Sequence, residues 1–193
     1  MNLIGEKVLI RNIKLGDAVL IAKWQNDRFI KRMALAPQHK TRIEDERRNI
    51  KNAVRSKSQL YLIITLRESS KPIGYIRINW LDKRESNAWL RFVLGESRKK
   101  GFARDAVYTL LRYLFSKNLH RVDAEVYKFN KRSAKLLRRL GFRIEGVRRK
   151  AHFDGKKYYD VVMLGLLKQD FGSGTKIGLS RKVDGRTPNK KRV

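Results

Sequence analysis

An apolar stripe between residues 103 and 115 constrains the fold of this chain more than any other feature of the sequence. Its seven members recur at intervals of three and four residues, which places them on one face of a helix of about four turns. Patterns typical of strands precede and follow this helix, so the order of elements is that of an α/β fold. The stripe consists of Ala103, Ala106, Val107, Leu110, Leu111, Leu114 and Phe115.

The remaining elements follow from runs of β-branched and aromatic residues, from helical spacing and from turn residues. The predicted strands are 7–13, 60–66, 73–81, 88–94, 121–127, 142–152 and 156–167. The predicted helices are 17–24, with Asp17 as its cap, 43–54 and 131–140, with Gly141 at its C-terminal end. Asp154 and Gly155 predict a hairpin turn, and residues 31–41, which include Pro37, predict a loop that borders a pocket.

These elements indicate one domain with one core over residues 1–167. The pattern stops at Lys168, and we expect residues 168–193 to form a basic tail that is flexible from Gly172 onward. The three tryptophans, Trp24, Trp80 and Trp89, are expected in the core rather than as platforms for stacked bases.

The charge balance points to an anionic partner. The chain has 47 Lys and Arg against 18 Asp and Glu, a net charge of +29. Such a field suits nucleic acid, a ribosomal surface or a phosphorylated cofactor, and composition alone does not choose among them. The same surplus is also compatible with a merely solvated basic surface.

Other chemistries are excluded or disfavoured by residue usage. The absence of cysteine excludes disulfides, thiolate zinc sites and a cysteine nucleophile, and three scattered histidines predict no metal centre. No apolar run approaches the roughly 20 residues that span a bilayer, and the first residues do not form a secretory signal. We therefore expect a soluble cytoplasmic protein that does not contact membranes and is a monomer or a homodimer.

The segment Arg98-Lys99-Lys100-Gly101-Phe102-Ala103 leads directly into the apolar helix. A helix N-terminus exposes unpaired N–H groups and a partial positive charge, so a phosphate group is held there by geometry and field together. Gly101 allows the anion to approach the backbone, Ala103 keeps the first turn open, and three cations surround it. The pattern predicts a pyrophosphate site, although a solvated helix cap would show the same residues.

This segment resembles the acetyl-CoA loop of the GNAT superfamily of N-acetyltransferases, which has the form Gln/Arg-x-x-Gly-x-Gly/Ala. A second match is "NKRSAKLLRRLGF", residues 130–142, where the resemblance places Asn130 and Ser133 along the pantetheine arm. The spacing of the two motifs and the opening "GEKVLIRNIKLGDAVLIAKWQND" look most like the Rim-type ribosomal-protein-alanine acetyltransferases. The resemblance covers residues 5–167. It implies a mixed, mostly antiparallel twisted sheet with helices on both faces, and acetyl-CoA as cosubstrate without a metal.

The resemblance also implies how the reaction runs. The strand before the loop is expected to splay from its neighbour and to offer backbone groups of Phe92, Val93 and Leu94 to the cofactor, with the donor to the thioester oxygen near Phe92 or Val93. The amine attacks the thioester directly, so no enzyme nucleophile is needed.

The general base and acid are less clear from the sequence. Trp89 occupies the position where Rim-type enzymes often carry a glutamate, and Leu137 occupies that of the family's tyrosine acid. Glu125 and Tyr159 are the candidates that remain, with Tyr158 and Asp160 beside the latter, while Glu125 is equally suited to an ion pair with a neighbouring cation.

Three functions stay open at this point. The first is acetylation of a protein N-terminal α-amine, as in the Rim-type enzymes. The second is a catalytically degenerate fold that binds RNA or the ribosome through its basic surface and tail. The third is acetylation of a small-molecule amine such as a polyamine or an aminoglycoside, which requires acidic residues around the acceptor.

Overall fold

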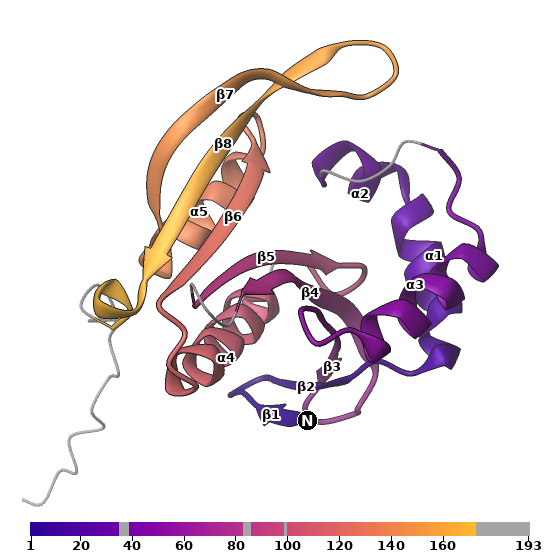
Figure 1. Cartoon of the computed structure of the whole chain (residues 1–193). Coiled ribbons are helices and arrows are strands. Elements are labelled where there is room, and N and C mark those ends of the chain that lie inside the picture. The colour runs from indigo at the N-terminus through magenta and orange to yellow at the C-terminus, as the bar shows by residue number, and fades with distance from the viewer. Residues whose placement is uncertain (35–38, 83–85, 99, 173–193) are drawn as a thin grey trace, which may run out of the picture.

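The computed structural model describes residues 1–34, 39–82, 86–98 and 100–172. Within these residues, eight strands form one sheet in the order β1-β2-β3-β4-β5-β6-β8-β7, and β5–β6 is the parallel pair in an otherwise antiparallel sheet (Figure 1). The strands are β1 (Asn2–Ile4), β2 (Val8–Asn12), β3 (Leu60–Leu66), β4 (Pro72–Asp82), β5 (Asn87–Leu94), β6 (Arg121–Tyr127), β7 (Arg143–Phe153) and β8 (Tyr158–Leu167). The helices are α1 (Ala18–Asn26), α2 (Arg28–Met33), α3 (Ile43–Arg55), α4 (Phe102–Ser116) and α5 (Lys131–Arg139).

Helices cover both faces of the sheet, as the resemblance implies (Figure 1). On one face, the apolar stripe of α4 and the inner side of α5 pack against alternate residues of the strands, Ile76 and Leu90 among them. On the other face, α1 and α3 cover a smaller cluster that includes Trp24, Tyr61 and Tyr75. Because successive side chains of a strand point to opposite faces, the sequence of β4 serves both cores. The predicted fold class is confirmed.

The sheet opens between its two central parallel strands. Pairing of β5 with β6 runs from Asn87–Arg121 to Leu90–Ala124 and then stops. Beyond this point β5 continues along β4 as far as Leu94, and β6 continues along β8 as far as Tyr127. The strand before the loop therefore splays from its neighbour, as expected.

Three local expectations need correction. A short helix, α2, occupies the beginning of the predicted loop 31–41, of which residues 35–38 lie outside the described residues. The three-residue strand β1 was not predicted, because its pattern is too short to be periodic. The chain also stays packed beyond residue 167: Lys168–Asp170 form a 3-10 turn, and the Phe171 ring lies 5.0 Å from that of Phe115. Residues 173–193 lie outside the described residues.

Candidate functional site

The predicted anion site lies at the first turn of α4. Gly101 is the N-cap residue and has φ of +85°, a left-handed conformation that glycine adopts without strain. It provides no side-chain acceptor, so the first amides of α4 keep free hydrogens, as at any uncapped helix start. A Cβ at Gly101 would meet only the Lys7 ammonium, at 3.7 Å. The backbone is therefore open to an anion.

Lys7 adds a cation here that sequence reasoning missed. Its Nζ donates to the carbonyl of Lys100 at 3.4 Å. The Asp105 carboxylate, in the first turn of α4, accepts hydrogen bonds of 3.1, 2.8 and 3.0 Å from the amides of Glu6, Lys7 and Val8. Asp105 thus fixes the β1–β2 turn against α4 and brings Lys7 to the helix start. Because the two segments are more than 90 residues apart in the chain, no local pattern signals this contact.

The three predicted cations before Gly101 differ in what they do. The Arg98 guanidinium turns back toward β5 and donates to the carbonyls of Leu94 and Gly95, both at 3.1 Å. It also lies 3.4 Å from the Asp27 carboxylate and stacks over the Phe29 ring at 4.6 Å. Arg98 therefore shapes the loop, whereas the exposed Lys100 flanks the helix start. Lys99 lies outside the described residues.

The splayed end of β5 offers backbone groups toward β6. The amide of Gly95 donates to the carbonyl of Ile73 on β4 at 2.9 Å. Since backbone groups alternate in direction along a strand, the amides of Phe92 and Leu94 point toward the gap, and that of Val93 points toward β4. Of the two predicted donors, Phe92 therefore has its amide on the open side, while Arg98 already occupies the Leu94 carbonyl.

Asn130 and Ser133 lie together at the start of α5. The Asn130 side chain accepts a hydrogen bond from the amide of Ser133 at 3.1 Å and donates one to the Met33 carbonyl at 2.8 Å. Asn130 thus caps α5 and joins it to the end of α2. The two predicted residues are next to each other and at the end of β6, the strand that borders the gap.

Glu125 lies on β6, one residue past the end of the β5–β6 pairing. Its carboxylate forms an ion pair with Arg148 at 3.0 Å, so the neighbouring cation that the sequence suggested is present. Leu137, at the position of the family's tyrosine, is fully buried in the core. Of the three tryptophans expected in the core, Trp24 is buried and Trp89 is half-buried, and the side chain of Trp80 lies outside the described residues.

Tyr159 lies on β8 near the hairpin turn. Its hydroxyl donates to the Asp154 carboxylate at 2.7 Å, and this hydrogen bond raises the pKa of the phenol above its usual value. The ring packs against Tyr127 and Phe129, with centroids 5.4 Å apart in both cases. The Tyr159 hydroxyl proton is thus already used in the hydrogen bond to Asp154. Asp160 contacts Lys128 at 3.0 Å, and the Tyr158 ring packs on Phe153.

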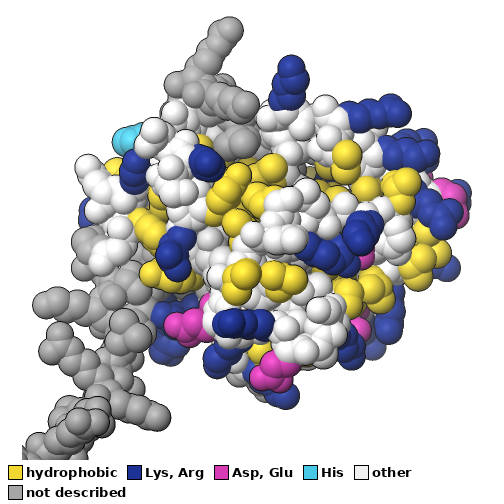
Figure 2. Space-filling view, turned by 90° about the horizontal axis from the view of Figure 1, so that it is seen from below, with side chains coloured by type: hydrophobic (Ala, Val, Ile, Leu, Met, Phe, Trp, Pro, Cys, Tyr) yellow, Lys and Arg dark blue, Asp and Glu magenta, His cyan; other side chains and the backbone are white. Residues whose placement is uncertain are grey.

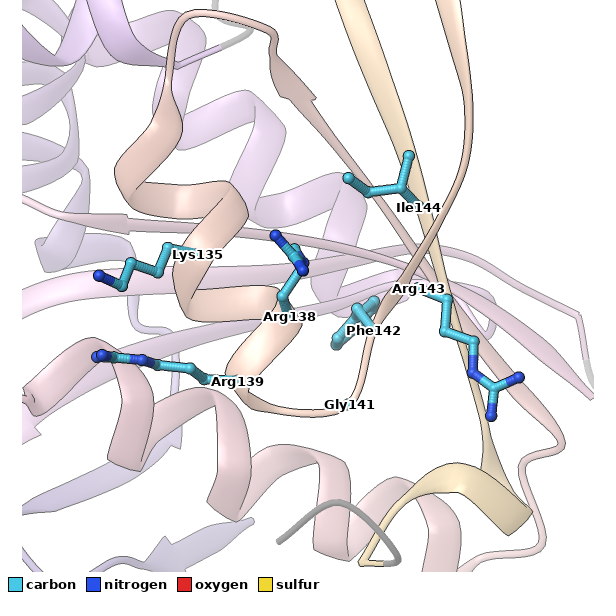
Figure 3. A pocket seen from close by; sticks show the side chains of 7 residues that line it. All are labelled: Lys135, Arg138, Arg139, Gly141, Phe142, Arg143 and Ile144. Atoms are coloured by element: carbon cyan, nitrogen blue, oxygen red, sulfur yellow. The ribbon is translucent and has the colours of Figure 1, made fainter.

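Two hollows open elsewhere on the surface. One, of about 760 Å³, lies between the C-terminal end of α5 and the start of β7 (Figure 3). Its lining has four cations and no carboxylate: Lys135, Arg138, Arg139, Gly141, Phe142, Arg143 and Ile144. The other, of about 690 Å³, adjoins the loop at Gly95 and Glu96 and the end of α1. Gly101 and Ala103 line neither of these two hollows.

Comparison with known proteins identifies the family. A family model of the acetyltransferase (GNAT) domain matches residues 7–143, which include β5, the Gly101 turn, α4 and α5. The chain belongs to the GNAT acetyltransferases. It is also 32% identical over 173 residues to an uncharacterised N-acetyltransferase, p20, of Bacillus licheniformis, a match that covers 86% of this chain and 96% of the relative. The enzyme is therefore an acetyl-CoA-dependent acyltransferase.

Solved GNAT structures share the fold at lower identity. The spermidine N-acetyltransferase of Vibrio cholerae, solved with CoA and spermine, is 21% identical with a TM-score of 0.78, and the match covers 84% of this chain and 96% of that one. The ribosomal-protein-S5-alanine acetyltransferase of Vibrio fischeri is 24% identical with a TM-score of 0.76, covering 89% and 98%. These similarities extend to the Rim-type enzymes but leave the acceptor of this GNAT protein open.

No three histidine, aspartate or glutamate side chains among the described residues come together in a way that could hold a metal ion. No helix in the described ranges has the length and apolar character needed to cross a membrane.

Proposed function

We propose that this GNAT enzyme transfers the acetyl group of acetyl-CoA to an α-amine at the N-terminus of a protein or peptide, as the Rim-type resemblance implies. The observation that carries the proposal is the open start of α4 at Gly101, next to the splayed end of β5. A diphosphate and an extended thioester arm need these two features side by side.

The residues present fit acetyl-CoA. Gly101, Phe102 and Ala103 would bind the pyrophosphate through backbone amides, with Lys7, Lys99 and Lys100 as flanking cations. Phe92, Val93 and Leu94 would align the arm along β5, with Asn130 and Ser133 on its other side. Arg98 would act by holding the turn in shape. Bound acetyl-CoA supplies an activated acyl group, and the amide of Phe92 is directed at the gap where the thioester oxygen would lie.

The absence of a strong free base among the described candidates favours an α-amine. At pH 7, the neutral form of a lysine amine costs about 4 to 5 kcal/mol, whereas that of an α-amine costs about 1 kcal/mol. Glu125 already has Arg148 as a partner, and the Tyr159 proton is held by Asp154. We propose Glu125, acting directly or through water, as the better candidate for proton transfer and Tyr159 as the weaker one.

A pair of glycine variants tests the cofactor site. Gly101 and Gly155 both have positive φ, +85° and +92°, and aspartate tolerates this conformation better than most residues. Gly101→Asp puts a negative charge where the diphosphate would bind, and Gly155→Asp puts the same charge on the distant hairpin turn. We expect acetyl-CoA to raise the melting temperature of the wild type and of Gly155→Asp but not of Gly101→Asp. An equal shift in all three would contradict the site.

Transfer itself is measured by the release of free thiol when amines are added with acetyl-CoA. We expect peptide α-amines to react at neutral pH much faster than N-terminally blocked peptides that retain a lysine. A preference for the lysine side chain would contradict the assignment of the α-amine.

A specific observation favours a second function, contact with RNA. The sequence of α5 is KRSAKLLRR, with five cations and no acid, and four cations line the hollow at its end (Figure 3). We propose that this surface binds phosphate groups of RNA and holds the enzyme near a ribosomal substrate. The basic tail would add to this attraction.

A further inference from the structure

Two arginines stand directly opposite each other where β5 and β6 separate. Arg77 on β4 pairs with Arg91 on β5, and on its other side Arg77 pairs with Tyr61 on β3. Two residues further along, Tyr75 and Val93 pair in the same way and belong to the cluster under α1 and α3. Side-chain alternation therefore places Arg77 and Arg91 on this same face of the sheet.

The position of the pair relates it to the acetyl group. Arg91 directly follows Leu90, the last β5 residue that pairs with β6. A strand rises about 3.3 Å per residue, so Arg91 lies about 3 to 7 Å along the strand from Phe92 and Val93. The proposed diphosphate site lies at the start of α4, which packs on one face of the sheet, so we assign the opposite face, with Arg91, to the acceptor.

Arg77 is held in a defined orientation. Its guanidinium carbon lies 4.4 Å from the centre of the Tyr61 ring. The Tyr61 hydroxyl donates a 2.7 Å hydrogen bond to the carboxylate of Glu46, which is fully buried. The carboxylate fixes the ring, and the ring supports the flat face of the guanidinium. A stacked guanidinium keeps its N–H groups at the edge, where they can bind an oxyanion.

Positive charge is in excess at this arginine pair. Like charges directly opposite each other destabilise a sheet, yet neither arginine has an ion pair within the described residues. On the neighbouring strand β6, Asp123 is paired with Arg121 and Glu125 with Arg148. Glu46, which lies behind the Tyr61 ring, is fully buried and has no ion pair among the described residues. The face therefore offers two accessible cations without ion pairs, whereas a polycationic acceptor would find the β6 carboxylates already paired and Glu46 buried.

We propose that Arg77 and Arg91 form an oxyanion subsite for the acceptor, so that the substrate is an amine carrying a carboxylate or a phosphate close to its nitrogen. This inference rests on the proposed function and deepens it. An N-terminus followed by an acidic or phosphorylated residue has this chemistry, and spermidine does not.

The test uses C-terminally amidated dipeptides in which the second side chain is the only oxyanion: Ala-Glu against Ala-Gln, and Ala-phosphoserine against Ala-Ser, with spermidine as a fifth acceptor. We expect kcat/KM of the wild type to be at least about tenfold higher for one charged peptide than for its neutral partner, the loss typical of a charge-assisted hydrogen bond. Comparison of the Ala-Glu and Ala-phosphoserine peptides shows whether the subsite prefers a carboxylate or a phosphate.

Arg77→Gln and Arg91→Gln should bring the charged and neutral rates to within about threefold of each other, with KM for acetyl-CoA unchanged. Arg47→Gln, which removes an exposed cation of α3, is the matched control and should keep the preference. Equal wild-type rates on charged and neutral peptides, or faster acetylation of spermidine, would overturn the subsite.

Failure of the proposed function gives a different result. If acetyl-CoA binds and no peptide is acetylated, the α-amine assignment fails, and the subsite is judged by binding of inorganic phosphate alone. Phosphate should then raise the melting temperature of the wild type and of Arg47→Gln more than that of the Arg77→Gln/Arg91→Gln double variant. An equal shift in all three proteins would overturn the subsite as well.

Discussion

At the scale of single residues, Glu46 stands out because its side chain is buried and needs hydrogen-bond donors from several elements. Its carboxylate is fully buried, and within the described chain its hydrogen-bond donors are neutral. The Tyr61 hydroxyl donates at 2.7 Å, and the amides of Gln25 and Asn49 donate at 3.2 and 3.3 Å. A buried charge is tolerated only when it is hydrogen-bonded, so these contacts tie α1, α3 and β3 together beneath Arg77.

Tyr61→Phe removes the shortest of these hydrogen bonds and keeps the ring. Because the buried carboxylate then loses the shortest of its three hydrogen bonds, we expect the free energy of unfolding to fall by about 1.5 to 3 kcal/mol. Urea denaturation measures the change. Tyr158→Phe, at an exposed ring, is the control and should change stability by less than about 0.5 kcal/mol. Equal losses in both variants would contradict the role of Glu46.

Two buried tyrosines, Tyr61 and its neighbour Tyr75, predict that the protein loses stability at alkaline pH. Burial raises the pKa of Tyr61 well above its usual value and that of Tyr75 to about 12. Below about pH 10 both phenols are neutral in the folded and unfolded states. As the pH rises from about 10 toward 12, the unfolded chain loses protons that the folded chain keeps, so stability falls. The urea midpoint should drop over this range, and the drop should shrink in a Tyr61→Phe/Tyr75→Phe variant.

At the scale of elements, the helix start at Gly101 shows what the sequence can and cannot predict. The apolar stripe of α4 and the glycine before it are local patterns, and the structure has both where the sequence indicates. The cation Lys7 reaches the same place through Asp105, from a turn more than 90 residues away, and no local pattern carries that information. The missed helix α2 has a related cause, since only Ile30 of its six residues is buried.

Lys7→Gln tests the contribution of that turn. Removing the ammonium leaves the Asp105 hydrogen bonds to the backbone intact, so stability should change little. Loss of one exposed cation near a diphosphate should weaken acetyl-CoA binding by about three- to tenfold, or about 0.7 to 1.4 kcal/mol. Calorimetric titration measures the affinity. Lys51→Gln, at an exposed position of α3, is the control, and a similar loss there would point to the overall field rather than to this site.

At the scale of the whole molecule, the fold was predictable and the acceptor was not. The order of elements and the two motifs suffice for the sheet and for the glycine turn before α4, because both depend on consecutive residues. The acceptor face is assembled from Tyr61, Arg77 and Arg91 on three strands, and its character depends on which carboxylates are already paired. Which carboxylates form ion pairs depends on the register of the strands, and the sequence alone does not give that register.

The net charge of +29 belongs to this scale as well. Figure 2 shows Lys and Arg side chains over much of one face, with few Asp and Glu among them. If only the general positive field attracts RNA, all of these cations contribute to binding. If α5 forms a defined binding surface, RNA binding depends on the cations of α5. The two cases differ in how binding responds to salt, because each neutralised phosphate releases counterions and contributes about 0.7 to the slope of log K against log salt for single strands.

A triple variant, Lys135→Gln/Arg138→Gln/Arg139→Gln, separates these cases. If α5 binds RNA, removing three phosphate contacts should reduce the salt slope for a single-stranded RNA by about 2 and weaken binding at low salt. The matched control changes Arg47, Lys51 and Arg55 to Gln, three exposed cations on α3. Equal effects of both triples would show that RNA responds only to total charge. Because the α5 cations lie outside the Gly101 turn, acetyl-CoA should stabilise all three proteins equally, and a loss confined to the α5 triple would instead assign its cations to the cofactor.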